Sequence, residues 1–397
     1  MINLTTSAST PKIYNETDFL ERICPYAFEK HFSLAVWQLP GERKRHVLIS
    51  KENQKVKREM PLEELREGFV FAPFNRNDDT VFLRADYVFS FEEGILIKPE
   101  ADAENALIDE LQEFIPAKQH RPYVVDNSNI EDSSREKFIA CASAGIKEIE
   151  NGNLEKIVPS RTHTVALTSG FNLVKNFQRL CDAFPNAMVS FVTTPETGTW
   201  MGATPELLVC VHDNLFKTVA LAGTQPYHEG INLKSVAWTQ KEIEEQALVE
   251  RYIISCFKKI RLREYNEQGP KTVVAGNLMH LRSDFTVDMK ETNFPQLGSV
   301  MLQLLHPTSA VCGMPLEPSM AFLQQHEGYH RKYYAGYLGP VNIQSQIHIF
   351  VNLRCLQITA HHAIIYAGAG VTSDSIPEKE WEETEMKINS LHQVLIP

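Results

Sequence analysis

Residues 363–387 read AIIYAGAGVTSDSIPEKEWEETEMK, and they carry the strongest structural signals in the chain. Residues 363–366 are apolar and β-prone, which predicts a strand. The glycine-rich residues 367–371 predict a turn. Ser375 and Glu378 then fit a capping box, and Pro377 suits the first turn of a helix. The stretch therefore predicts a strand, a glycine turn and a helix in succession.

The predicted helix concentrates charge on one side. Glu380, Glu383 and Lys387 recur at i, i+3 and i+7, so they share one face. Two carboxylates and an ammonium beside a glycine turn form a candidate site for a divalent cation and an anionic ligand. A solvated helix end stabilised by i, i+4 pairs is the alternative. On this segment alone, both interpretations stay open.

Composition restricts the class of protein. The chain has 397 residues, of which 43% are hydrophobic and 22% are charged, and these values are ordinary for a globular protein with a sizeable core. The length suits two or three domains, or one large mixed domain. A formal net charge of -11 argues against nucleic acid as a partner. An acidic chain that binds an anion must build a local cationic pocket or recruit a metal.

The N-terminus and the cysteines indicate a cytoplasmic protein. Residues 1–6 lack the charged start and apolar core of a signal peptide. No apolar stretch is long enough to span a bilayer, so we expect no membrane association. The seven cysteines are scattered without a C-x-x-C pair. This distribution predicts buried thiols in a reducing compartment, not disulfides or a zinc site.

Two long helices are indicated in the middle of the chain. Ser133 or Ser134 can cap the first, which follows a polar stretch at 126–129. Thr239 and Glu242 form a capping box for the second.

Runs of apolar and β-branched residues predict strands around these helices. The run 156–165 contains Pro159, so we expect it at a sheet edge or with a bulge. Strands interleaved with long helices predict an α+β architecture with large sheets. No G-x-G-x-x-G unit and no Walker A sequence supports nucleotide binding. The predicted strands are 32–37, 80–88, 156–165, 187–192, 207–211, 216–221, 348–353 and 363–366.

Two residues stand where burial would change their protonation. Glu206 lies between a Gly/Pro turn and an apolar strand, so desolvation would raise the pKa of its carboxyl group and suit it to general acid catalysis. The alternative is a turn carboxylate that accepts hydrogen bonds from nearby backbone amides. Lys156 begins an apolar strand. It either extends its ammonium to solvent or, when desolvated, loses its proton and acts as a base.

Two further features are less specific. Gly223, in the sequence LAGT at 221–224, would let the backbone come close to a ligand. Glu245 lies among other glutamates on the second long helix, where a solvated position is the simpler interpretation.

A series of short segments in fixed order is more specific than any one of them. It resembles the chorismate-utilising enzymes, which include anthranilate, aminodeoxychorismate, salicylate and isochorismate synthases. The resemblance covers roughly residues 130–397. The segments are 156–161 (KIVPSR), 202–208 (GATPELL), 221–224 (LAGT), 241–245 (KEIEE), 280–281 (HL), 305–313 (LHPTSAVCG), 334–339 (YAGYLG), 354–355 (RC), 367–370 (AGAG) and 380–387 (EWEETEMK).

The resemblance implies a fold. In this family, one large α+β domain packs two big antiparallel sheets together, with helices outside and the active site between the sheets. Residues 126–397 would form the chorismate-binding catalytic region. Residues 1–125, which fit only by length and general character, would be the N-terminal part of the same domain. The family branch also implies a monomer that needs no glutaminase subunit.

Three positions separate the activities within the family. Lys156 stands where anthranilate synthases usually have glutamine, Ala222 where aminodeoxychorismate synthases have a nucleophilic lysine, and Ala310 where salicylate synthases typically have threonine. All three choices resemble isochorismate synthases, whose product would feed menaquinone, a catechol siderophore or salicylate. The alternatives are a salicylate synthase, which also eliminates pyruvate, and a non-catalytic chorismate-binding subunit.

The resemblance also implies a role for each site residue. Lys156 would remove a proton from the water that attacks C2 of chorismate, and Glu206 would protonate the leaving C4 hydroxyl. Mg²⁺ would be the cofactor. Its ligands would be Glu245, Glu383 and Glu380, and the substrate contacts would be Gly223, Thr224, Ala310, Arg354, Gly368 and Lys387.

The chain departs from the family pattern at several points. Glu242 replaces an aspartate and Gln246 a histidine on the helix expected to bind metal. Thr204 replaces the serine of a Ser-Pro-Glu motif, and residues 225–227 (QPY) replace an arginine-rich turn. None of these changes removes a catalytic group, but the last puts the role of its loop in doubt.

Overall fold

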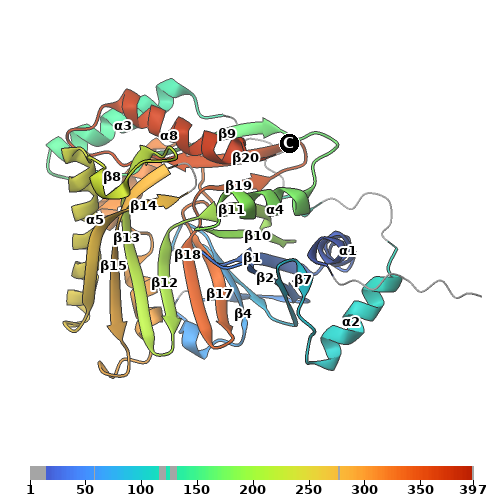
Figure 1. Ribbon diagram of the computed structural model, residues 1–397. Coiled ribbons are helices and arrows are strands. Elements are labelled where there is room, and N and C mark those ends of the chain that lie inside the picture. Colours follow the sequence, from blue (N-terminus) through green and yellow to red (C-terminus); the bar gives the residue numbers. More distant parts are fainter. Residues whose placement is uncertain (1–14, 58, 116–121, 126–131, 276–277, 396–397) are drawn as a thin grey trace, which may run out of the picture.

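In the described part of the chain, most strands form two nine-stranded sheets (Figure 1). The computed structural model describes residues 15–57, 59–115, 122–125, 132–275 and 278–395. Neighbouring strands are antiparallel throughout both sheets. The expected α+β fold with two large antiparallel sheets is therefore confirmed. The polar stretch at 126–129 lies outside the described residues.

The strands follow in sheet order. The first sheet comprises β7 (Ile95–Leu96), β6 (Tyr87–Glu92), β2 (Lys44–Ser50), β1 (Ser33–Gln38), β10 (Met188–Thr194), β11 (Gly198–Thr204), β19 (Cys355–Ile358), β20 (His362–Gly368) and β9 (Ser160–Ala166). The second comprises β14 (Asn266–Ala275), β15 (Leu278–Asp288), β13 (Leu215–Pro226), β12 (Leu207–His212), β18 (Gln346–Val351), β17 (Tyr337–Ile343), β4 (Gly68–Ala72), β5 (Thr80–Arg84) and β3 (Asn53–Val56). A small third sheet pairs β8 (Lys156–Ile157) with β16 (Gly313–Met314).

Helices cover the sheets from outside (Figure 1). Contacts place α1, α2, α4 and α8 against the first sheet, and α5 and α6 against the second. The helices are α1 (Glu16–Glu29), α2 (Asp102–Glu113), α3 (Arg135–Glu150), α4 (Leu173–Ala183), α5 (Gln240–Lys259), α6 (Leu297–Leu305), α7 (Leu316–His326) and α8 (Pro377–His392), with short 3-10 turns η1 (Leu62–Glu64) and η2 (Leu233–Ser235).

Strand β1 shows how the first sheet is buried on both faces. Leu34 and Val36 belong to the apolar cluster beneath α1 and α4. Their neighbour Trp37 points the other way, into the cluster between the sheets. There Trp200 of the first sheet lies 6.3 Å from Phe71 of the second, measured between ring centroids. Burial of both faces explains why this strand is continuously apolar and not alternating.

The chain before residue 126 contributes strands to both sheets: β1, β2, β6 and β7 to the first, and β3, β4 and β5 to the second. The single strand expected over 80–88 is consequently wrong. That run contains strand β5 of the second sheet and the first residues of strand β6 of the first sheet. Asp86 stands at the crossing and accepts hydrogen bonds from the backbone of Lys51 and from Arg84.

Some of the other local expectations are confirmed and one is wrong. The strand over 156–165 is split at Pro159 into β8 and β9, and β9 is an edge strand as expected. Ser134 caps α3, and the Thr239 capping box of α5 is formed. The capping box expected at Ser375 is wrong. Helix α8 begins at Pro377 after an uncapped Ile376, because the Ser375 hydroxyl accepts from the backbone of Thr372.

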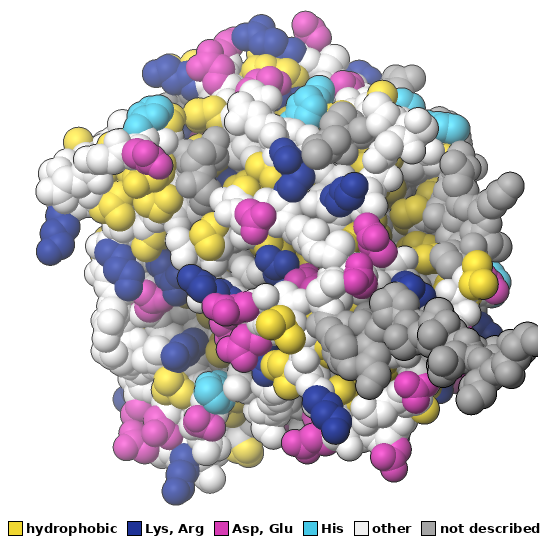
Figure 2. All heavy atoms as spheres, turned by 45° about the vertical axis from the view of Figure 1, so that its right-hand side comes forward, with side chains coloured by type: hydrophobic (Ala, Val, Ile, Leu, Met, Phe, Trp, Pro, Cys, Tyr) yellow, Lys and Arg dark blue, Asp and Glu magenta, His cyan; other side chains and the backbone are white. Residues whose placement is uncertain are grey.

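The surface and the cysteines agree with the composition. All seven cysteines are buried free thiols. Among the described residues, no helix is long and apolar enough to cross a membrane. On the face shown in Figure 2, acidic and basic side chains are interspersed, and the basic ones do not gather into one patch.

Candidate active site

A cavity lies where the ends of strands from both sheets meet α5 and α8. Its wall takes residues from β13 and β15 of the second sheet, from β20 of the first, and from the turn between β11 and β12. The wall includes most of the predicted site residues, which are Glu206, Gly223, Thr224, Glu245, Ala310, Arg354, Gly368, Glu383 and Lys387.

The two remaining predicted residues, Lys156 and Glu380, lie just outside this wall. The Lys156 side chain is 0% exposed, and its Nζ donates to Glu245 Oε1 at 2.9 Å. Glu380 is 1% exposed, and both of its carboxylate oxygens accept from Lys241 Nζ, at 2.7 and 2.9 Å. Lys156 is thus one contact away from the cavity, through Glu245.

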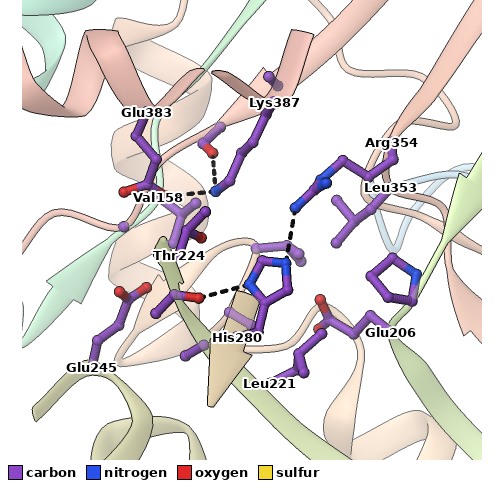
Figure 3. A pocket seen from close by; sticks show the side chains of 18 of the residues that line it. Val158, Glu206, Leu221, Thr224, Glu245, His280, Leu353, Arg354, Glu383 and Lys387 are labelled. Atoms are coloured by element: carbon purple, nitrogen blue, oxygen red, sulfur yellow. Dashed lines mark hydrogen bonds and ion pairs between the residues drawn. The ribbon is translucent and has the colours of Figure 1, made fainter. Parts of the chain in front are cut away.

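A third pair completes the arrangement. Lys387 Nζ donates to Glu383 Oε1 at 2.7 Å and to the carbonyl oxygen of Gly368 at 2.9 Å (Figure 3). Each of the three glutamates expected to bind metal therefore holds a lysine ammonium. The pairs connect β8 to α5 and α5 to α8, so the same contacts that neutralise the charges also fix these elements relative to one another.

Lys241 has strongly acidic surroundings. Burial alone would lower the pKa of Lys241, but the carboxylates of Glu383, Glu380 and Glu245 outweigh it and raise the pKa. For Glu245 the balance is reversed: burial would raise the pKa of its carboxyl, and Lys156 and Lys241 hold it below its usual value. All three carboxylates therefore act electrostatically on the Lys241 ammonium.

The glycines of the AGAG segment pack closely against neighbouring groups. A Cβ at Gly370 would lie 2.3 Å from Glu245 Oε1 and 3.1 Å from Lys156 Cε. A Cβ at Gly368 would lie 3.0 Å from both the carbonyl of Pro159 and the hydroxyl of Tyr334. The backbone here covers the Lys156–Glu245 pair so closely that a side chain at residue 370 would displace the Glu245 carboxylate.

Glu206 lies apart from these pairs, on the opposite side of the cavity in Figure 3. It is 6% exposed, and burial raises the pKa of its carboxyl to about 7. The Thr308 hydroxyl donates to Oε1 at 3.3 Å and opposes the rise, as do the more distant cations. Thr204 holds the turn, because its hydroxyl donates to the Val351 carbonyl and accepts from the Glu206 backbone. The change from the family's serine preserves this hydroxyl.

Arg354 and His280 occupy the centre of the view in Figure 3. Arg354 Nη2 lies 3.2 Å from His280 Nε2, and His280 Nδ1 lies 2.7 Å from the carbonyl oxygen of Gly223. Arg354 has a left-handed backbone, with φ of 45°, and its carbonyl accepts from the Ala203 backbone. Gly202 is required beside it, because a Cβ there would lie 2.8 Å from the Arg354 carbonyl.

The departures near β13 compensate one another. Gly223 sits at a bulge with φ of 69°, where the register with β15 shifts. Gln225 Nε2 donates to Glu242 Oε2 at 2.9 Å and so ties this bulge to the first turn of α5. Gln246 Nε2 lies 3.3 Å from the Ala220 carbonyl on the same strand. The residues that depart from the family pattern therefore connect β13 to α5.

The carboxylates fit a hard divalent cation in their chemistry, since Mg²⁺ prefers oxygen ligands. Within the described part of the chain, however, no three acidic, histidine or cysteine side chains converge closely enough to hold an ion as they stand. The lysine partners explain this separation. Glu245, Glu380 and Glu383 could bind a metal beside their lysine partners or in place of them, because an ionised carboxylate offers about four lone-pair sites.

Sequence reasoning missed several residues of the site. Tyr334, Leu353 and His280 line the cavity, and His280 forms a hydrogen bond with Arg354. Tyr334 and His280 belong to the ordered segments, so their place in the series was a signal, although it gave them no role. Lys241 directly precedes the Glu242 of the capping box, and only the tertiary contact with Glu380 gives it importance.

A family model for chorismate-binding enzymes matches residues 74–396. The chain belongs to the chorismate-binding enzyme family. Chorismate is therefore the substrate that the family implies, and the match begins earlier than the resemblance recognised from about residue 130.

Individual relatives are distant. The chain is 25% identical to the vibriobactin-specific isochorismate synthase of Vibrio cholerae over 268 residues, which are 66% of this chain and 67% of the relative. It is 24% identical to anthranilate synthase component 1 of Thermococcus kodakarensis over 273 residues, 66% of this chain and 61% of the relative. The solved structure of the menaquinone-specific isochorismate synthase of Escherichia coli matches with a TM-score of 0.72 at 19% identity, over 94% of this chain and 91% of that one, which shows a common fold.

Thr308→Val should move the alkaline limb of the pH profile of kcat/KM for chorismate to higher pH. Glu206 has a pKa raised to about 7, so an acid function is lost as the pH rises through that value. The Thr308 hydroxyl favours the ionised form, and its removal should raise the pKa further. Thr308→Ser keeps the donor and serves as the control. A limb that stays in place in Thr308→Val would show that another group produces it.

Proposed function

We propose that the chain is an isochorismate synthase, which adds water at C2 of chorismate and expels the C4 hydroxyl. The observation that carries the proposal is the buried carboxyl of Glu206, with a pKa raised to about 7. A group that is about half protonated at neutral pH can donate a proton to a leaving hydroxyl and be restored afterwards.

Three residues favour water as the nucleophile and an intact pyruvyl group. Ala222 and Ala310 both line the cavity, so a lysine in place of Ala222 or a threonine in place of Ala310 would change its chemistry directly. Ala222 offers no nucleophile, and Ala310 leaves room for water. Lys156, buried beside Glu245, supplies an amine where relatives that use ammonia have an amide.

The proposed acid and base act from different parts of the site. Glu206, held by the Thr204 turn, would protonate the C4 hydroxyl as it leaves. Lys156 would take a proton from water, but its Nζ donates to Glu245 in this structure. A neutral amine can keep this donor bond to Glu245 and still offer its lone pair to a water proton.

The remaining charges would hold the substrate. Arg354 and Lys387 line the cavity and would bind the two carboxylates of chorismate, Arg354 in a bidentate manner. Glu245 and Glu383, with Glu380 directly or through water, would hold Mg²⁺. When bound, the ion supplies positive charge for the ring carboxylate that would otherwise approach these glutamates.

The products formed from chorismate test this proposal. With Mg²⁺, chromatography should show isochorismate and neither salicylate nor pyruvate. Excess EDTA should abolish turnover, and added Mg²⁺ should restore it. Salicylate with equimolar pyruvate would establish the salicylate synthase alternative. Binding of chorismate without any product would favour the non-catalytic subunit, and full turnover in excess chelator would remove the metal from the proposal.

Lys156→Gln and Glu206→Gln should each lower turnover by roughly a hundredfold or more, the usual contribution of general acid–base catalysis. Both variants should still bind chorismate, because neither residue is assigned to a substrate carboxylate. Matched controls on the exposed first turn of α8 are Lys379→Gln and Glu378→Gln. Near-normal turnover in either variant, or a loss traceable to weaker binding alone, would contradict the assigned proton transfer.

A further inference from the structure

The contact between His280 and Arg354 crosses from one sheet to the other. His280 lies on β15 of the second sheet, and Arg354 directly precedes β19 of the first. Both residues line the cavity. Their hydrogen bond measures 3.2 Å, and the other ring nitrogen of His280 lies 2.7 Å from the Gly223 carbonyl. The imidazole thus connects the bulge of β13 to the guanidinium.

The partners determine the tautomer of His280. A carbonyl oxygen only accepts, so Nδ1 must carry the hydrogen that bonds Gly223. A guanidinium only donates, so Nε2 must present its lone pair to Arg354. Burial and the neighbouring Arg354 lower the pKa of His280 to about 3, which keeps the ring neutral. This ring can therefore receive a hydrogen bond from Arg354 throughout the neutral pH range.

Arg354 is fixed at both ends. Its backbone is left-handed, and its carbonyl accepts from Ala203 at 3.0 Å. Among the described residues, His280 is the partner that hydrogen-bonds its guanidinium. A guanidinium has five N–H donors, so most of them remain for an anionic ligand. The interaction holds the group in place without using up its donors.

The acidic groups near Arg354 show why the position of its guanidinium matters. The carboxylates of Glu383 and Glu206 both act electrostatically on Arg354, so they are the anions toward which a released guanidinium would turn. A pair with Glu206 would favour its ionised form and remove the proton that the proposed reaction needs. A pair with Glu383 would occupy an expected metal ligand.

We propose that His280 is a positioning residue that aims Arg354 at a carboxylate of chorismate and keeps it from pairing with Glu206 or Glu383. This inference rests on the proposed function, because it assigns Arg354 to the substrate. His280 acts through Arg354 and takes no part in proton transfer.

A double-mutant cycle on chorismate binding tests the inference. Chorismate affinity is measured by titration calorimetry without turnover, in buffer containing EDTA, for wild type, His280→Leu, Arg354→Gln and the double variant. Loss of a hydrogen bond to a charged group should weaken binding by roughly tenfold to a hundredfold in His280→Leu. In the Arg354→Gln background, the same change should cost less than about twofold. Effects that multiply would show that His280 contacts the substrate itself, and unchanged affinity in His280→Leu would overturn the inference.

His280→Gln is the matched rescue variant. Its amide can donate to Gly223 and accept from Arg354, so it should bind chorismate within about threefold of wild type. If His280→Leu does not fold, as judged by circular dichroism and Tm, His280→Met replaces it, because methionine fills irregular apolar space. A glutamine variant that binds no better than the apolar variant would also contradict the inference.

The pH profile gives a second readout that a merely structural role would not move. Release of Arg354 toward Glu206 should shift the alkaline limb of kcat/KM to lower pH in the apolar variant but not in His280→Gln. Wild-type binding of chorismate without isochorismate formation would refute the proposed function alone. The positioning role would still stand or fall on the binding cycle.

Discussion

Charges buried where the sheets meet α5 and α8 must be neutralised by one another, and the active site depends on this constraint. Removing one partner of such a pair leaves an uncompensated charge, at a cost of about 3–5 kcal/mol. The Lys156–Glu245 and Lys241–Glu380 pairs join β8, α5 and α8, which come from distant parts of the chain. Gly370 allows the backbone to cover the first pair. The same few contacts therefore determine the packing, the placement of the helices and the electrostatics of the site.

The constraint also explains why glutamates of one site can differ in protonation. Glu245 has ammonium partners, and these hold the pKa of its carboxyl below the usual value. Glu206 has a hydroxyl at 3.3 Å and no cation in contact among the described residues, so burial raises its pKa. His280 maintains the difference by holding Arg354 away from Glu206. A site with one proton-bearing carboxyl opposite carboxylates that pair with lysines can give a proton on one side and bind cations on the other.

Local chemistry was predictable from sequence where it alone decides the structure. The Thr239–Glu242 capping box formed as expected, since all its partners lie within one turn. Ser375 did not cap α8, because a backbone amide outside the helix takes its hydroxyl. The apolar and β-branched run over 80–88 could not show that the chain changes sheets near Asp86.

The site was predictable as a set of residues but not as a set of contacts. The ordered segments named Glu206, Glu245 and Arg354, and the structure brings them to one cavity. The partner of Glu245 is 89 residues away, a relation that no helical periodicity contains. The segments also did not reveal that Arg161 anchors α8 by stacking on Trp381, 3.8 Å from its ring centroid.

The central claim is that water enters at C2 while Glu206 expels the original hydroxyl. Turnover of chorismate in water enriched in oxygen-18, followed by mass spectrometry of the product, tests it most directly. The account predicts isochorismate that carries one atom of oxygen-18 at C2. Isochorismate without the label would mean that the hydroxyl migrates within the substrate, and it would contradict the proposed roles of both Lys156 and Glu206.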